Sequence, residues 1–162
     1  ELEVIIRKFI LKPDVEKNIK IESIFLLNKI GSKGPYHVLL DDEIRVVSID
    51  SDSLLEDEWK DEWEEVKSMA LGMMMNCYDN DEYVKIVEDI WYDFIRSTYP
   101  DVPKIGKKEI WAAALEFVYC KFICKEVTLQ QLAVKYKVST NSISQKAKII
   151  LRHMENKFGE RK

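Results

Sequence analysis

Apolar residues recur at intervals of three and four along most of the chain after residue 56. Over residues 57–77 this spacing predicts an amphipathic helix whose apolar face carries Trp59, Trp63, Val66, Ala70, Met73 and Cys77. Residues 81–98 predict a second helix, with an inward face made of Tyr83, Val87, Ile90, Trp91 and Phe94. Pro100 ends this helix, because proline cannot continue one. The pattern therefore indicates an α-helical bundle.

Residues 108–123 are apolar on nearly every side, which is typical of a helix that other helices cover all round. We expect this helix to be central, with five buried residues: Trp111, Ala113, Leu115, Val118 and Phe122. Three consecutive alanines, residues 112–114, remove bulk at one level and let neighbouring helices approach closely.

Residues 127–154 predict two helices joined by a tight turn, the helix-turn-helix arrangement. Thr128 can cap the first helix and Ser139 or Thr140 the second, because hydroxyl oxygens accept the free N–H groups at a helix start. The apolar faces comprise Leu129, Leu132, Ala133 and Tyr136, followed by Ile143, Ala147, Ile150 and Met154. Lys137 occupies the turn position commonly held by glycine, where a left-handed backbone would cost about 1 kcal/mol.

The front of the last helix carries polar side chains that can donate to phosphates and base edges: Thr140, Asn141, Ser142, Ser144, Gln145, Lys146 and Lys148. We predict that this helix enters a DNA major groove while Lys135, Lys137 and Lys146 hold phosphates. Helical hairpins of this kind also serve as packing units alone, so both interpretations stay open here.

Residues 1–55 give weaker signals. EVIIRKFIL fits a short helix or a strand, and HVLL and EIRVV flank Asp41 and Asp42 as the two strands of a hairpin would. Residues 50–53 resemble a polar linker. We therefore predict a small mixed α/β appendage at residues 1–55 and a five-helix domain at residues 56–162, with the helix-turn-helix at 127–154.

Charge is distributed unevenly along the chain. Residues 1–101 hold 12 Lys and Arg against 24 Asp and Glu, whereas residues 102–162 hold 13 against 5. A basic half favours contact with nucleic acid or with an acidic protein. Alternatively, the two parts neutralise each other inside one fold.

The composition argues against a membrane protein or a secreted one. The longest apolar run, residues 110–123, is interrupted by Glu116 and Lys121 and is shorter than the roughly 20 residues that a bilayer requires. Three cysteines form no disulfide framework, and no signal-type segment opens the chain, so we expect a cytoplasmic location. The first residue is Glu, so native N-terminal residues could precede it.

No catalytic residue, metal ligand or cofactor is expected. The two histidines, His37 and His153, have no nucleophile at a recognisable spacing. Cys120 and Cys124 lie one helical turn apart, but a metal site needs four ligands, so His153 and Cys77 would have to converge on them. Buried structural cysteines are favoured. A weaker alternative is a metal-dependent nuclease that uses four N-terminal acids, Asp41, Asp42, Asp50 and Asp52.

The stretch from Val87 to Ile150, which contains KKEIWAAALEFVYCKF followed by VTLQQLAVKYKVSTNSISQKAKII, resembles a cyclin-like repeat of the transcription factor IIB family. In that repeat an alanine-rich central helix precedes a short helix led by threonine, and a Val-Ser turn leads into the last helix. The end, TLQQLAVKYKVSTNSISQKAKIILR, is also similar to the promoter-reading region of bacterial sigma factors. The chain has one such repeat and no cysteine-rich zinc ribbon.

The resemblance implies a mainly α protein with a five-helix cyclin-like bundle that ends in a helix-turn-helix. It also implies a binding module, since cyclin-like domains include DNA-binding members and members that bind only proteins. We predict a non-enzymatic, DNA-binding or transcription-associated regulator. The alternative is a protein-interaction module without nucleic-acid contact, whose basic face docks an acidic partner or whose acidic, tryptophan-bearing helix docks a basic one.

Overall fold

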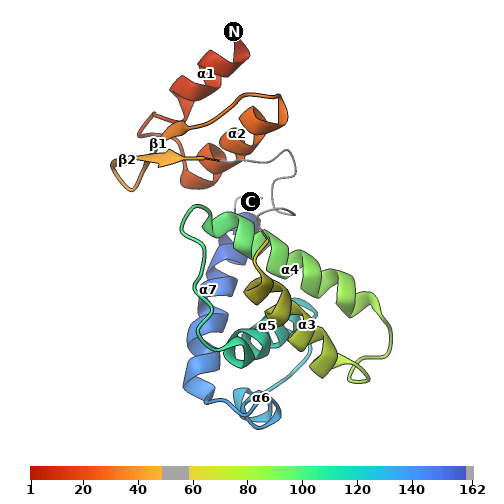
Figure 1. Ribbon diagram of the computed structural model, residues 1–162. Coiled ribbons are helices and arrows are strands. Elements are labelled where there is room, and N and C mark those ends of the chain that lie inside the picture. Colours follow the sequence, from red (N-terminus) through yellow and green to blue (C-terminus); the bar gives the residue numbers. More distant parts are fainter. Residues whose placement is uncertain (49–58, 160–162) are drawn as a thin grey trace. The chain divides into compact units, whose positions relative to one another are not determined.

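The computed structural model describes residues 1–48 and 59–159 of the 162-residue chain. These residues form seven helices and one two-stranded sheet, so the chain is mainly α-helical (Figure 1). The chain divides into two compact units, Glu1–Trp59 and Lys60–Lys162. The predicted boundary after residue 55 and the predicted linker at residues 50–53 lie outside the described residues.

The N-terminal unit contains helices α1 (Leu2–Phe9) and α2 (Lys17–Lys29) and strands β1 (Tyr36–Leu40) and β2 (Glu43–Val47). The segment that fitted either a helix or a strand is therefore helical. The predicted hairpin is confirmed: β1 and β2 pair antiparallel, with Leu40 opposite Glu43. Asp41 and Asp42 form the turn with φ of 50° and 63°, the backbone that matches the twist of two-residue hairpins.

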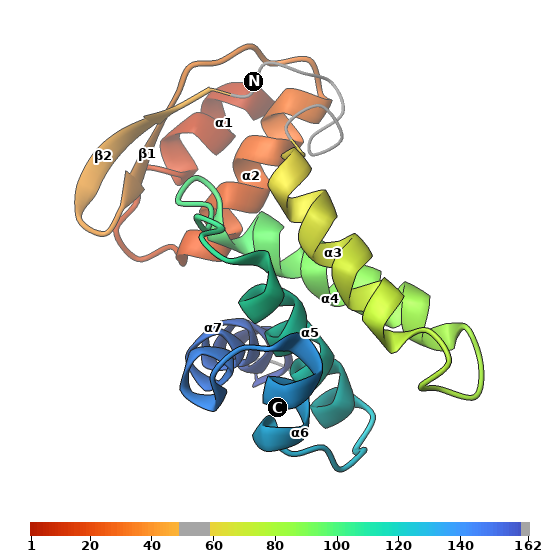
Figure 2. The ribbon, with the colours of Figure 1, turned by 60° about the horizontal axis from the view of Figure 1, so that its bottom comes forward.

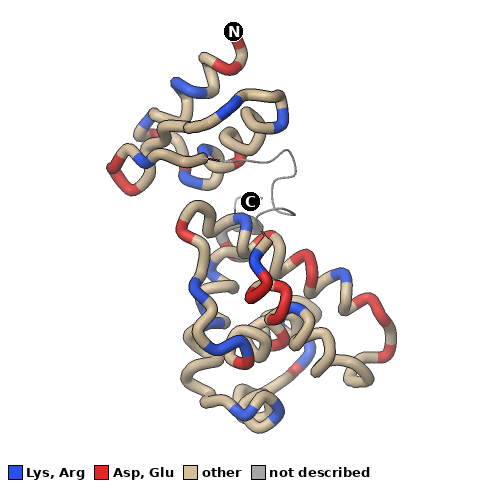
Figure 3. The backbone as a smooth tube through the Cα atoms, viewed as in Figure 1, with Lys and Arg blue, Asp and Glu red and all other residues tan. Residues whose placement is uncertain are grey.

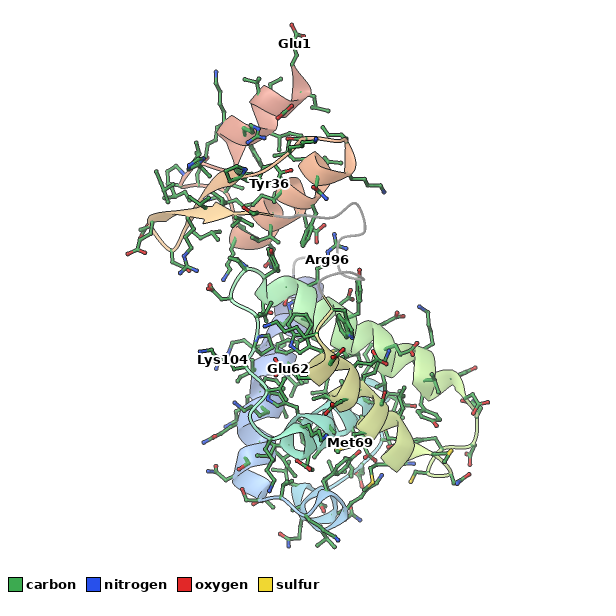
Figure 4. All side chains as sticks on the ribbon, in the orientation of Figure 1. Glu1, Tyr36, Glu62, Met69, Arg96 and Lys104 are labelled. Atoms are coloured by element: carbon green, nitrogen blue, oxygen red, sulfur yellow. The ribbon has the colours of Figure 1, made fainter. Side chains whose placement is uncertain are left out.

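The core of the N-terminal unit lies between the sheet and its helices. Tyr36, which is labelled in Figure 4, is fully buried together with Val38 on the same face of β1. Ile10 and Leu27 are also fully buried. α1 and α2 both pack against β1, so one face of the hairpin is covered.

The second unit consists of helices α3 (Asp61–Met74), α4 (Glu82–Thr98), α5 (Lys108–Phe122), α6 (Leu129–Tyr136) and α7 (Thr140–Gly159). The five predicted helices are therefore present. The bounds of the first of them were predicted wrongly as 57–77. α3 begins at Asp61 and ends at Met74, so Trp59 precedes the helix and Cys77 follows it. The first turn of α3 holds Asp61, Glu62 and Glu64, and negative charge is favourable at that end.

Helix α5 is central, as predicted, because it packs against α3, α4, α6 and α7 (Figure 2). Its three alanines, residues 112–114, are completely buried, so neighbouring helices approach its backbone at that level. Trp111, Leu115 and Val118 are buried as expected, as is Ala113 among the alanines. Phe122 is 49% exposed, contrary to the prediction, because α5 ends there and the ring lines a surface pocket.

Candidate nucleic-acid interface

Helix α6 begins at a complete capping box. Thr128 Oγ1 accepts a hydrogen bond from Gln131 N at 3.1 Å, and Gln131 Oε1 accepts one from Thr128 N at 2.9 Å. Each side chain thus satisfies an N–H group that the helix start leaves free. The predicted Thr128 cap is confirmed, and this eight-residue helix has a fixed beginning.

Three residues connect α6 to α7, and their backbone makes a sharp turn. Lys137 has φ 55° and ψ 47°, the left-handed conformation expected at this position. Val138 N donates to Ala133 O at 3.1 Å, which satisfies a carbonyl at the end of α6. Ser139 Oγ accepts a hydrogen bond from Ser142 N at 3.1 Å, so Ser139 caps α7. Residues 127–154 therefore form the predicted helix, turn and helix.

The two helices are held by a third. α5, α6 and α7 pack against one another, with Leu132, Ile143 and Ile150 buried between them. Because the opposite side of α7 is unburied, its first turns present polar groups outward.

Four exposed residues of α7 share one face: Asn141, Gln145, Lys148 and Arg152. Their spacings of four, three and four place them along one line of the helix, opposite the buried residues. We call these four residues, together with Lys137 in the turn, the outer strip. Thr140 and Ser144 lie beside it and are half-buried, although both were predicted to face outward.

Arg152 is a member of the outer strip that the polar pattern of residues 140–148 did not predict. It continues the predicted polar face one turn beyond Lys148, so extending the helical spacing would have found it. Among the described residues, the ammonium groups of Lys137 and Lys148 and the guanidinium of Arg152 have no carboxylate partner. These three cations are available for a ligand.

Two predicted contact residues serve the fold instead of standing free. Ser142 Oγ hydrogen-bonds with Ser139 Oγ at 2.7 Å, within the cap of α7. The Lys146 ammonium lies 4.9 Å from the centre of the Trp111 ring, over its face, where a cation is attracted to the aromatic electrons. Lys146 thereby links α7 to α5.

Lys135 points inward to a buried carboxylate, away from the outer strip. Its Nζ lies 2.8 and 2.9 Å from the two oxygens of Glu116, whose side chain is 4% exposed. Tyr136 OH donates to Glu116 at 2.5 Å, and Tyr78 OH donates at 3.1 Å. We call these four residues the Glu116 cluster. The predicted phosphate contact by Lys135 does not fit this geometry, because its ammonium is already bound.

Burial shapes the chemistry of the Glu116 cluster. Desolvation, followed by the Cys120 thiol and the Glu116 carboxylate, raises the pKa of Tyr78. Desolvation and Glu116 also raise the pKa of Tyr136 far above its ordinary value. Both phenols therefore keep the protons that they donate to Glu116. In sequence the only sign of this cluster is a charged residue inside an otherwise apolar helix, since buried charges are almost always paired.

The uneven charge seen in the sequence lies largely within the second unit, residues 60–162. Residues 127–154 contain no Asp or Glu and five Lys or Arg, whereas α3 and α4 carry many acidic residues (Figure 3). Some neutralisation occurs, since Lys108 Nζ lies 2.7 Å from Glu65. The cations of the outer strip take no part in this neutralisation, so α6 and α7 present a basic surface.

The remaining candidates give no assembled site. In the described part of the chain, no three His, Cys, Asp or Glu side chains gather to hold a metal ion. Cys120 is buried, and burial raises the pKa of its thiol, whereas Cys77 and Cys124 are exposed. Asp41 and Asp42 form the hairpin turn, and Asp50 and Asp52 lie outside the described residues.

Comparisons with known proteins add no relative: no protein-family model, curated protein or solved structure matches the chain. No helix in residues 1–48 and 59–159 combines the length and the apolar character needed to cross a membrane. The geometry of α6 and α7 is therefore the basis for any functional argument.

Proposed function

We propose that the protein is a non-enzymatic, DNA-binding or transcription-associated regulatory module that places the start of α7 in the major groove. The observation that carries this proposal is the outer strip, an exposed polar line that begins in the three-residue turn and continues along α7. A short helix that supports a second helix with a free polar face is the geometry by which helix-turn-helix proteins contact bases.

The side chains of the outer strip divide into two chemical classes. Asn141 and Gln145 carry amides, which donate and accept together and match the edge of adenine. Lys137, Lys148 and Arg152 are cations that contact phosphates. Lys135, Ser142 and Lys146 are assigned to the fold, and the half-buried hydroxyls of Thr140 and Ser144 flank the bases.

The arrangement of the helical unit supports the proposed kinship with cyclin-like repeats. The unit has five consecutive helices, and the third of them, α5, is rich in alanine and is surrounded by the other four. A short helix capped by Thr128 and a Val-Ser turn at residues 138 and 139 follow it. A relationship of this kind fits a binding module and leaves its ligand to be tested.

A surface pocket favours the alternative function, a protein-interaction module. The pocket is about 150 Å³ and lies between α4, α5 and α7, where Ile86, Ile90, Phe122 and Met154 line it. Acidic residues at positions 89 and 93 also line it, and Asp89 is paired with Lys85 at 2.8 Å. A basic partner that presents an apolar side chain would therefore replace Lys85 at Asp89. This site is separate from the outer strip, and mutations can therefore distinguish the two functions.

Selection from random duplex DNA, followed by affinity measurements at several salt concentrations, tests the proposal. Asn141→Ala and Gln145→Ala are expected to cost roughly 1–3 kcal/mol at particular base pairs, since each removes a base contact. Lys148→Ala and Arg152→Ala should weaken binding to all sequences and reduce the salt slope by about 0.9 each.

Lys85→Ala is a control for the loss of one surface lysine, because Lys85 is exposed on α4, outside the strip, where it pairs with Asp89 at 2.8 Å. It should change neither selectivity nor the salt slope. If the wild-type protein binds no duplex at low salt, where phosphate contacts are strongest, DNA recognition is rejected. The pocket then becomes the leading site, and a basic protein partner replaces DNA.

A further inference from the structure

Strand β2 has a backbone edge that faces away from its only partner in the described residues. Leu39 N, on β1, donates to Ile10 O at 3.1 Å, so the N–H of Leu39 points away from β2. Leu39 lies opposite Ile44, and in an antiparallel ladder both members of such a pair turn their N–H and C=O groups outward. The backbone groups of Ile44 therefore point to the outer edge, as do those of Val46 two residues on.

The same strand exposes large apolar side chains. Ile44 is 65% exposed and Val46 is 61% exposed, on the face of the hairpin opposite the buried Tyr36 and Val38. Within residues 1–48 and 59–159, the sheet contains no third strand. An open edge with exposed apolar side chains is a template for pairing with another strand.

We propose that the N-terminal unit forms a two-fold dimer in which β2 pairs antiparallel with β2 of a second copy. The two hairpins then make one four-stranded sheet, and two copies of Ile44 lie opposite each other at the axis. Each Ile44 donates its N–H to the carbonyl of the other. The Ile44 and Val46 side chains of both copies come together on one face of this sheet.

Charge complementarity favours a second copy of β2 as the pairing strand, and it also selects the register of the pair. With Ile44 at the axis, Glu43 of each copy lies opposite Arg45 of the second copy, at a position where opposing side chains are closest. Registers centred on Glu43 or Arg45 place like charges opposite each other. The register centred on Val46 leaves Arg45 opposite Val47. The strand is thus complementary to itself in one register only.

Glu43 is open to this pairing, whereas Arg45 exchanges contacts within its own copy to make it. Glu43 is exposed, and its carboxylate has no ion pair among the described residues. The Arg45 guanidinium lies 3.6 Å from Asp41, and 34% of its side chain is exposed. The inference is independent of the proposed function; if both hold, the DNA site contains two half-sites.

Measurement of molar mass by sedimentation, with the full chain, tests the dimer. Glu43→Arg makes the edge wholly basic and Arg45→Glu makes it wholly acidic, so each variant repels itself. Each should raise the dimer dissociation constant at least about tenfold, because two cross-strand attractions become repulsions. An equimolar mixture of the two variants should form a heterodimer, since every Arg then faces a Glu. Asp14→Arg and Lys12→Glu, in the loop between α1 and α2, make the same charge changes away from β2 and should leave dimerisation unchanged.

Three results would overturn the proposal. These are a monomeric wild-type protein at the highest soluble concentration, single variants that dimerise like the wild type, and a mixture that does not associate although both variants are folded by circular dichroism.

If a charge variant fails to fold, a crosslinking experiment takes the place of the charge exchange. Ile44→Cys, in a Cys77→Ser, Cys124→Ser background, should form an intermolecular disulfide with oxidised glutathione, whereas Val46→Cys should not. Equal crosslinking at the two positions contradicts the register.

Discussion

The Glu116 cluster and the outer strip use the same kinds of side chain on adjoining helices for opposite purposes. In the cluster, the ammonium of Lys135 is bound to a carboxylate that is 4% exposed. In the strip, Lys148 is exposed, and its ammonium has no carboxylate partner among the described residues. The side of the helix on which a lysine lies therefore decides whether it serves the fold or a ligand.

The cluster also connects parts of the chain whose relative positions determine how the outer strip faces solvent. Tyr78 follows α3, Glu116 belongs to α5, and Lys135 and Tyr136 belong to α6. A buried carboxylate with three donors is satisfied in one arrangement, and losing any donor leaves charge or hydrogen-bonding capacity unpaired. We infer that the cluster fixes α6, and with it the turn that leads into the outer strip.

The largest effect is expected from the apolar core beside the cluster. Leu115 is adjacent to Glu116 on α5 and is completely buried. Leu115→Ala should lower the free energy of unfolding by roughly 2–5 kcal/mol, through lost burial and the cavity left behind. Urea titration of the variant and the wild type measures this difference. Equal unfolding midpoints would contradict the central position of α5.

A pair of identical substitutions compares the two polar regions directly. Lys135→Met should lower the free energy of unfolding by about 3 kcal/mol, because the Glu116 carboxylate loses its cation while it remains buried. Lys148→Met should change stability by less than about 0.5 kcal/mol, since the residue is exposed and without a carboxylate partner. DNA affinity should show the reverse order once both proteins are measured below their unfolding temperatures. Similar losses of stability in the two variants would remove the distinction between cluster and strip.

The features that sequence predicted well depend on neighbouring residues. The cap predicted at Thr128 involves only the first turn of α6, and the turn position predicted at Lys137 involves only the short break between two apolar faces; the reciprocal bond from Gln131 was not predicted. The hairpin around Asp41 and Asp42 depends on two short apolar strands that flank a two-residue turn. Such signals lie within a few positions of one another, so one sequence contains all of the information needed.

The errors occurred where distant segments decide the environment. Lys135 follows the buried Leu132 by three residues and precedes Tyr136, so it stands at the border of the apolar face, where a long side chain can turn either way. Its direction depends on Glu116, 19 residues earlier. Phe122 matches the apolar pattern of α5, but it is the last residue of that helix, and its ring lines a surface pocket formed with α4 and α7. Periodicity cannot supply either fact.

A smaller effect than that of Leu115→Ala or Lys135→Met is expected at Lys137, which belongs both to the turn and to the outer strip. Its left-handed backbone is strained for a residue with a side chain, and glycine adopts it without that strain. Lys137→Gly should therefore raise the free energy of unfolding by about 0.5–1 kcal/mol, after the entropy that glycine adds to the unfolded chain is subtracted. The same variant should reduce the salt slope of DNA binding by about 0.9, because one phosphate contact disappears.

Lys137→Ala separates the two roles of this residue. It removes the charge but keeps the β-carbon, so it should reduce the salt slope equally without increasing stability. Thermal unfolding and salt-dependent DNA binding of the two variants provide the measurements. A Lys137→Gly protein that is both more stable and unchanged in salt slope would place Lys137 outside the interface and leave it a role in the turn alone. A fall in stability with glycine would instead mean that the lysine side chain makes a stabilising contact that outweighs its backbone strain.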